Sequence, residues 1–214
     1  MNLKNSMILA NMMRKSEGVK FKTSIYSQDN AYINTGITNT NIYGLRVKGS
    51  VRVNSYTGHQ QQIICGYIDY SSSGANISCF VNSTIGGTVP TNYREVKISI
   101  KEGNIERDNI QIADNSGIIK VNTFDLKFID TTNTGTKGQF EYKIFTGNRA
   151  NQGGSFIEFT NGVVALEIVE LYDISGNMIA ELKPAIVNGE NGMYDTIGQK
   201  FYGNSNSVGS LICE

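Results

Sequence analysis

Apolar and polar side chains alternate along most of the chain, and this pattern restricts it to β structure. The alternation is clear over residues 45–53, 95–101, 124–128 and 140–144. Because successive side chains of a strand point to opposite faces, a period of two predicts strands with one face on a core and one in water. This is typical of antiparallel sheets. Gly49, inside the first segment, predicts a β-bulge or a close backbone contact.

Two further segments, residues 62–68 and 162–169, are apolar at both parities and predict central strands covered on both faces. Clusters of Gly, Asn, Ser and Thr separate the strands and favour tight turns. These turn signals fall at residues 70–74, 86–87, 102–104, 115–117, 131–135, 147–148, 153–154, 175–177 and 188–192. Many short strands at this spacing predict a single sandwich or jelly roll.

Composition excludes several classes of protein. The chain has 214 residues, a length that suits one large β domain. The formal net charge is +0, so nothing global draws the chain to nucleic acid or to an anionic membrane surface. No stretch approaches the roughly 18 uninterrupted apolar residues of a transmembrane helix. Neither a nucleic acid nor a membrane is therefore expected as a partner.

The closing part of the chain carries short motifs in a fixed order. They are Tyr-Asp at 172–173, Leu-Lys-Pro at 182–184, Gly-Met-Tyr-Asp at 192–195 and Lys-Phe-Tyr at 200–202, after an opening Ala-Tyr-Ile-Asn-Thr-Gly-Ile at 31–37. Together they resemble the LamG-like, concanavalin A-like jelly-roll domains of bacteriophage structural proteins, over about residues 26–212. The opening departs from the family at Asn34, where the family usually has Asp.

The resemblance implies an all-β, two-sheet antiparallel jelly-roll sandwich over residues 21–214, preceded by a short N-terminal arm. The matched positions are expected to be framework rather than a ligand site, because large rings there fix how hairpins stack. These framework residues are Tyr32, Gly36, Tyr172, Asp173, Pro184, Gly192, Tyr194, Asp195, Phe201 and Tyr202.

The resemblance also implies a function. It indicates a non-enzymatic structural protein of a phage virion, made in the host cytoplasm, as a surface, fibre or decoration component of head or tail. The expected partners are other virion proteins, sister copies in a homotrimer, and host-surface glycans. The alternatives are a carbohydrate-binding adhesin of the tail and a polysaccharide-degrading enzyme, since one fold hosts many functions.

Residues 1–20 differ from everything that follows. Four of the six methionines, at 1, 7, 12 and 13, lie here, and the apolar spacing is that of a helix. A lone helix of this length is marginal in water and needs a surface to lie on. We expect an attachment or oligomerisation arm, with a disordered tail as the alternative.

Motifs for catalysis are sparse. His59 is the only histidine and lies in a polar loop, so two-histidine zinc motifs are excluded and no Gly-x-Ser-x-Gly supports a triad. A glycosidase needs two carboxylates that face each other across the bond. Glu167 and Glu170 are three residues apart and should fall on opposite faces of a strand. Acids from separate strands could still converge, but no enzyme is expected.

The three cysteines, Cys65, Cys79 and Cys213, form no Cys-x-x-Cys motif. Cys65 and Cys79 lie on apolar segments, where a thiol behaves as a small hydrophobe. An odd count and no export signal favour free thiols in a reducing cytosol.

No cofactor or metal ligand set is indicated. Calcium requires oxygen-rich loops, and candidates occur at Asp108-Asn109, Asp114-Asn115 and 130–133, but no Asp-x-Asp-x-Asp-Gly loop exists. Turn chemistry accounts for these residues. The segment 134–138 lacks the spacing of a phosphate loop and predicts a hairpin turn.

Two surface features are compatible with ligand binding but do not by themselves predict it. Arg46, Lys48 and Arg52 form a basic stripe, which is either a solvated face or a contact surface for an anionic polymer. Tyrosine could form a sugar platform, although Trp is absent. The tyrosines concerned are Tyr26, Tyr32, Tyr43, Tyr67, Tyr70 and Tyr93.

Overall fold

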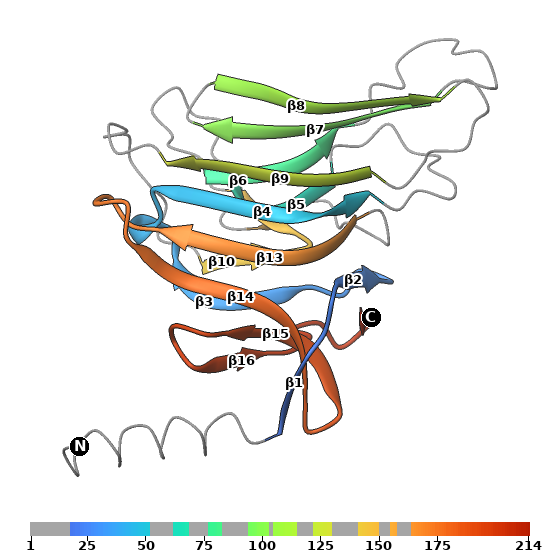
Figure 1. The fold of residues 1–214 in the computed structure, drawn as a ribbon, viewed down its shortest axis with the longest axis vertical. Helices are drawn as coiled ribbons and strands as arrows, with labels where there is room; N and C mark the ends of the chain where they lie inside the picture. The colour runs from blue at the N-terminus through green and yellow to red at the C-terminus, as the bar shows by residue number, and fades with distance from the viewer. Residues whose placement is uncertain are drawn as a thin grey trace, which may run out of the picture.

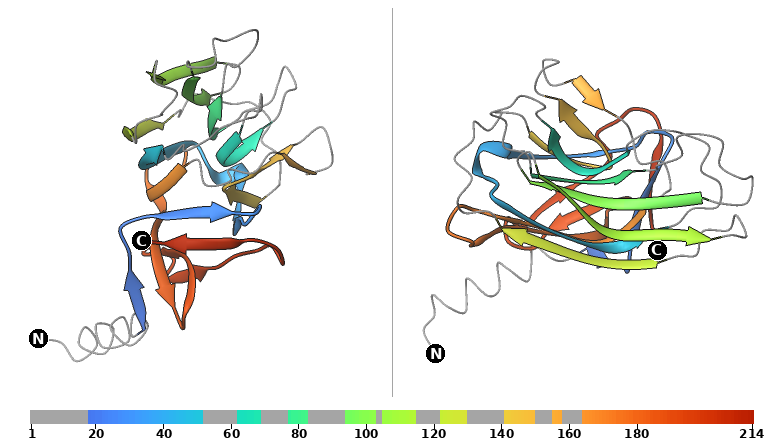
Figure 2. Two further views of the ribbon diagram at one scale, coloured as in Figure 1. Left: turned by 90° about the vertical axis from the view of Figure 1, so that its right-hand side faces the viewer. Right: turned by 90° about the horizontal axis from the view of Figure 1, so that it is seen from above.

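The structure, a computed structural model, is almost entirely β (Figure 1). It describes residues 18–51, 62–68, 77–82, 94–102, 105–114, 122–129, 141–149, 155–157 and 164–214. Their strands form two sheets that face each other, and one short 3-10 helix is present (Figure 2). The prediction of an all-β, two-sheet sandwich is confirmed.

The first sheet, sheet A, has nine strands. Its path runs β16-β15-β14-β13-β2-β17, while β1 pairs with β14, and β4 joins β13 to β9. The strands are β1 (Val19–Phe21), β2 (Ile25–Gln28), β4 (Gly44–Val51), β9 (Asn122–Ile129), β13 (Val164–Tyr172), β14 (Met178–Val187), β15 (Glu190–Asp195), β16 (Lys200–Tyr202) and β17 (Ser210–Cys213).

The second sheet, sheet B, has eight strands in the path β12-β11-β5-β6-β7-β8, with β10 paired to β5 and β3. The strands are β3 (Ile33–Thr38), β5 (Gln62–Ile68), β6 (Ile77–Asn82), β7 (Arg94–Glu102), β8 (Ile105–Asp114), β10 (Glu141–Ile144), β11 (Gly147–Arg149) and β12 (Ser155–Ile157). The helix η1 (Asn39–Asn41) links β3 to β4.

One described strand pairing is parallel, namely β11 on β5. The chain leaves β10, which is antiparallel to β5, and turns at Phe145, whose φ is 67°. It then runs back beside β5 as β11. The prediction of a turn at residues 147–148 is therefore wrong, because the reversal comes earlier and these residues pair with Tyr67 and with β12.

The core lies between the sheets and is built from their inward-facing side chains. Sheet A contributes residues such as Leu45 and Leu171, and sheet B contributes Ile33, Ile64 and Tyr142, all without exposed surface. The predicted alternation along residues 45–53 thus places one parity of β4 in the core. Burial of this kind is the main force that holds the sheets together.

A β-bulge at Glu167 changes which residues of β13 face outward. The register of β13 on β4 shifts between Leu166 and Ile168. Before the shift, residues 164 and 166 face the core, and after it residues 169 and 171 do. The expectation that Glu167 and Glu170 fall on opposite faces is wrong, because the extra residue shifts the alternation and both carboxylates reach cations on the outer side of β4.

Gly49 confirms the predicted close contact and lies beside this bulge. It pairs with Leu166, and a Cβ at this position would lie 2.2 Å from the carbonyl oxygen of Ala165. Only a residue without a Cβ lets the two backbones approach so closely.

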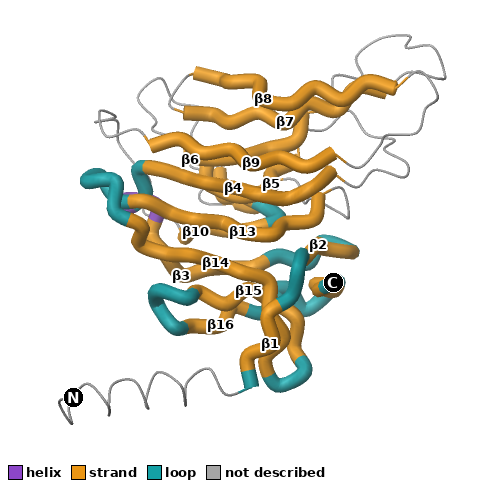
Figure 3. Tube along the Cα trace, in the orientation of Figure 1, coloured by secondary structure: helices purple, strands orange, loops and turns teal. Residues whose placement is uncertain are grey.

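The two predicted turns of the closing segment are present, the second one shorter than expected (Figure 3). The first joins β13 to β14 at residues 173–177. The second consists of Asn188 and Gly189, with φ of 53° and 85°, which suits a two-residue hairpin. Residues 190–192, expected in the turn, are strand and pair with β14.

Both ends of the described chain join sheet A. Val19 pairs with Val187, so the sheet begins before the predicted boundary at residue 21, and residues 1–17 lie outside the described part. At the other end β17 pairs with β2. The amide of Glu214 donates to the carbonyl of Ser24 at 2.9 Å, and Figure 1 shows the C-terminus beside β2.

Candidate ligand-binding pocket

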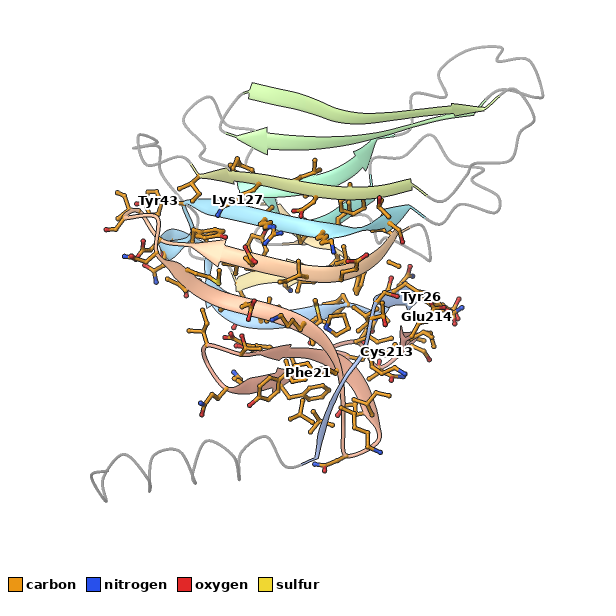
Figure 4. The ribbon with its side chains drawn as sticks, in the orientation of Figure 1. Phe21, Tyr26, Tyr43, Lys127, Cys213 and Glu214 are labelled. Carbon is orange, nitrogen blue, oxygen red and sulfur yellow. The ribbon has the colours of Figure 1, made fainter. Side chains whose placement is uncertain are left out.

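A pocket of about 430 Å³ opens where three connections of the sandwich meet. These are η1 with the residues around it, the β13–β14 turn, and the start of the β15–β16 turn. The lining residues are Ile37, Asn41, Tyr43, Asp173, Ile174, Ile179 and Asp195. Figure 4 labels Tyr43 at this end of sheet A, near the beginning of β4.

Tyr43 is fixed by the backbone around it. Its amide donates to the carbonyl of Tyr172 at 2.7 Å, which ties the chain after η1 to the end of β13. The preceding Ile42 is fully buried and the following Gly44 begins β4. This leaves the half-buried Tyr43 to line the pocket.

Asp173 is held as an anion by its own turn. Its Oδ1 accepts from the amides of Ser175 at 2.9 Å and Asn177 at 2.8 Å, and its Oδ2 accepts from the side-chain amide of Asn177 at 3.1 Å. These donors, above all those of Asn177, lower the pKa of Asp173. A carboxyl with a lowered pKa is a hydrogen-bond acceptor near neutral pH and a poor general acid.

Asp195 is the buried carboxylate of the pocket, with 3% of its surface exposed. Its Oδ1 accepts from the amides of Glu181 at 3.1 Å and Ile197 at 3.0 Å. Its Oδ2 receives no hydrogen bond or ion pair from the described residues. Burial, and secondly the charge of Asp195, raise the pKa of the Tyr202 hydroxyl.

The chemistry of the lining is two-sided. Three isoleucines and the tyrosine ring offer apolar contact, while two carboxylates and the amide of Asn41 offer hydrogen bonds. No lysine or arginine is among the described residues that line the pocket. Pockets that combine apolar walls with a few placed polar groups are typical small-molecule sites. This one suits a ligand with an apolar face and several hydrogen-bond donors.

The outer face of sheet A carries a separate polar cluster, whose members form hydrogen bonds and ion pairs with one another. Arg46 binds Asp125 through Nε at 2.7 Å and Nη2 at 2.8 Å, and binds Glu170 through Nη1 at 2.9 Å. The Tyr172 hydroxyl also donates to Glu170. Lys127, labelled in Figure 4, lies 4.5 Å from the centre of the Tyr172 ring.

Lys48 extends this cluster and pairs with Glu167 at 2.6 Å. The basic stripe expected from the sequence is therefore neutralised by carboxylates at Arg46 and Lys48, while Arg52 lies outside the described residues. This pairing favours a structural role for the face over a contact surface for an anionic polymer.

The expected framework residues have several surroundings. Six are buried: Tyr172, Pro184, Gly192, Tyr194, Asp195 and Tyr202. Tyr32, Asp173 and Phe201 are half-buried, and Gly36 is exposed. Phe201 covers Gly192, where a Cβ would lie 2.6 Å from the ring. The structure brings two of these residues, Asp173 and Asp195, into the pocket.

Of the other sequence candidates, Tyr43 is among the described residues that line the pocket. Tyr26 and Tyr32 lie on or next to β2 and β3, whereas His59, Tyr70, Tyr93 and residues 130–138 lie outside the described part. Sequence reasoning missed Ile37, Asn41, Ile174 and Ile179, which no motif marks. The interpretation of Asp108, Asn109 and Asp114 as loop or turn residues is wrong, because all three belong to β8; Asn115 is not described.

The cysteines behave as expected of free thiols. Cys65 and Cys79 lie opposite each other on β5 and β6, are fully buried and form no disulfide. Burial raises the pKa of Cys65 to about 12, and the Tyr142 hydroxyl lies 3.5 Å from its Sγ. Cys213 is half-buried, with Sγ 3.6 Å from the carbonyl oxygen of Ala185.

Within the described residues, no cluster of three or more His, Cys, Asp or Glu side chains suits a metal ion. No helix in the same part of the chain has the length and apolarity needed to cross a membrane. Comparison of the chain with protein-family models, with curated proteins and with solved structures found no match.

Proposed function

We propose that this chain is a non-enzymatic surface component of a phage-like particle and that its pocket binds host-surface glycan. The particle, the jelly-roll topology and the trimer come from the motif resemblance. The observation that carries the glycan part is the pocket itself, where isoleucine side chains and a tyrosine ring lie beside carboxylate acceptors. Sugar rings present an apolar face and a rim of hydroxyl donors, and each finds its complement here.

In the alternative function, a polysaccharide-degrading enzyme, Asp173 does not suit the role of general acid. Two carboxylates line one pocket, as hydrolysis would require, but a general acid needs a raised pKa. The pKa of Asp173 is lowered by its turn. Incubation of the protein with bound glycan, followed by a reducing-sugar assay, separates the two functions. Release of reducing ends would show that the protein is an enzyme rather than an adhesin.

The glycan proposal is tested by a glycan array with purified wild type and two variants. Tyr43→Ala removes the pocket's ring, and Tyr26→Ala is the matched control, since Figure 4 shows the two tyrosines at opposite ends of the sheet. We expect Tyr43→Ala to lose at least tenfold in affinity, as loss of a large apolar contact costs about 1.5–3 kcal/mol. Tyr26→Ala should bind as wild type does. Melting curves establish that both variants fold.

An array on which the wild type binds no glycan would refute the glycan part. Equal loss from both tyrosine variants would place the site elsewhere. The virion part needs its own experiment, namely electron microscopy of particles labelled through this chain. Label on the particle surface with threefold density supports the proposal, and particles that carry no label contradict it.

A further inference from the structure

We infer that the pocket prefers an amino sugar, a hexose with a free protonated amine, over neutral, N-acetylated or acidic sugars. This inference rests on the proposed glycan function and names the ligand class of the same pocket. Its basis is the buried carboxylate oxygen of Asp195, which the described protein leaves without a donor.

The first step is the charge of the pocket. Asp173 is kept ionised by the three donors of its turn, and Asp195 adds a second carboxylate. On the neighbouring strands, Lys183 pairs with Glu181 at 3.0 Å, and the Lys200 ammonium lies 4.8 Å from the centre of the Tyr202 ring, on the side of Gly36. Among the described residues, no cation lines the pocket to offset the carboxylates. Like charges repel, so uronic acids and phosphorylated sugars are disfavoured.

The second step is the unsatisfied oxygen. Asp195 is 3% exposed, and the amides of Glu181 and Ile197 both donate to its Oδ1. The Oδ2 lies beside Gly198, where a Cβ would lie 2.5 Å away, so a side chain at residue 198 would crowd this oxygen. A buried carboxylate oxygen without a donor is costly, and a ligand that supplies one relieves that cost.

The third step selects the donor. A hydrogen bond between an ammonium and a carboxylate is about twice as strong as one between neutral groups. A sugar ammonium therefore gains more from Asp195 Oδ2 than a hydroxyl does, while the isoleucines pack on the ring's apolar face. N-acetylation removes the charge and adds bulk, so the acetylated sugar loses this gain.

The test is isothermal titration of the folded wild type with three oligosaccharides of equal length. They are β-1,4-linked glucosamine with free amines, its N-acetylated form, and the glucose oligomer. We expect the free amine to bind at least tenfold more tightly than either of the others. Added salt should weaken only the free-amine oligomer.

Three variants locate the effect. Asp195→Asn keeps the Oδ1 acceptor and removes the charge, so it should reduce the preference to below threefold. Gly198→Ala should weaken the free-amine oligomer by crowding Oδ2. Glu190→Gln removes an equal charge at the far end of the β14–β15 hairpin and should change nothing. Melting curves identify any variant that fails to fold; for such a variant, the wild-type comparison of the three sugars decides alone.

The outcomes separate this inference from the proposed function. A wild type that binds glycans but takes the free amine no better than its acetylated or neutral forms overturns the inference and leaves glycan binding intact. An Asp195→Asn variant that keeps the full preference overturns the inference in the same way. A wild type that binds no sugar on any array overturns both.

Discussion

Replacement of Arg46 by Met should destabilise the protein far more than its position on an outer sheet face suggests. Arg46 joins two carboxylates of very different exposure: the side chain of Asp125 is 42% exposed and that of Glu170 is 4% exposed. The exposed pair contributes at most about 1 kcal/mol, because water screens it. The buried partner decides the outcome, because its carboxylate would remain in the sheet without a cation.

Loss of one partner from a buried ion pair costs about 3–5 kcal/mol. The Tyr172 hydroxyl still donates to Glu170 in the variant, and methionine preserves much of the arginine stem, so we expect the lower end, about 3 kcal/mol. In a domain of this size that corresponds to a drop of roughly 6–12 °C in melting temperature. Urea unfolding followed by circular dichroism measures both the midpoint and the slope.

Two comparisons make this prediction refutable. Lys48→Met removes a neighbouring cation of β4 whose partner, Glu167, is 28% exposed, and it should leave the midpoint nearly unchanged. The double variant Arg46→Met with Glu170→Gln removes both charges and should recover most of the loss. If Arg46→Met unfolds at the same urea concentration as Lys48→Met, or the double variant recovers nothing, the ion pair does not control stability.

Three other predictions concern the framework. Gly49→Ala should lower the free energy of unfolding by about 2–3 kcal/mol, because its Cβ would meet a backbone carbonyl. Gly189→Ala should lower it by about 1 kcal/mol, because residue 189 has open space but a positive φ. Equal urea midpoints for the two variants would contradict this. A thiol reagent should label only Cys213 in the native state and all three cysteines in urea, whereas fast native labelling of a second thiol would show that the sheets open. The pKa values of Asp173 and Glu181 are lowered in the folded state from 3.8 and 4.5. Both carboxylates therefore stabilise the fold above these values, and this stability is lost as the pH falls through the folded pKa values. At pH values below about 4.5, the urea concentration at the unfolding midpoint should decrease.

Much of the sheet framework is predictable from the sequence because burial imposes a period. The apolar run at residues 62–68 predicts a central strand and forms β5 with these bounds, flanked by β6 and by β10. Errors arise where one residue alters the period or where composition misleads. The bulge at Glu167 is a single insertion, and its only signal is a strand that is apolar at both parities. β8 is rich in Asp and Asn, residues that favour turns, yet it pairs along its length with β7.

The pocket is not predictable in this way, because its parts are distant in sequence. Tyr43 precedes β4, Asp173 follows β13 and Asp195 ends β15, and only the pairing of β4, β13, β14 and β15 brings these ends together. The turn after Asp173 is recognisable from the sequence Ser-Gly-Asn, and the turn explains the hydrogen bonds that the Asp173 carboxylate accepts. Whether these carboxylates border a cavity depends on where the sheet places its loops, and no local sequence pattern contains that information.

The pairing of β2 with β17 has a consequence for synthesis on the ribosome. Ile25 pairs with Cys213, and the amide of Thr23 donates to the carbonyl of Glu214 at 2.7 Å. Chains emerge from the N-terminus, so the earliest strand of this pair waits until nearly two hundred further residues have been translated. Contacts of such sequence separation form slowly. Until β13 is translated, β2, with its fully buried Ile25, therefore has neither of its strand partners, and its other edge stays open until β17 is made at the end of the chain.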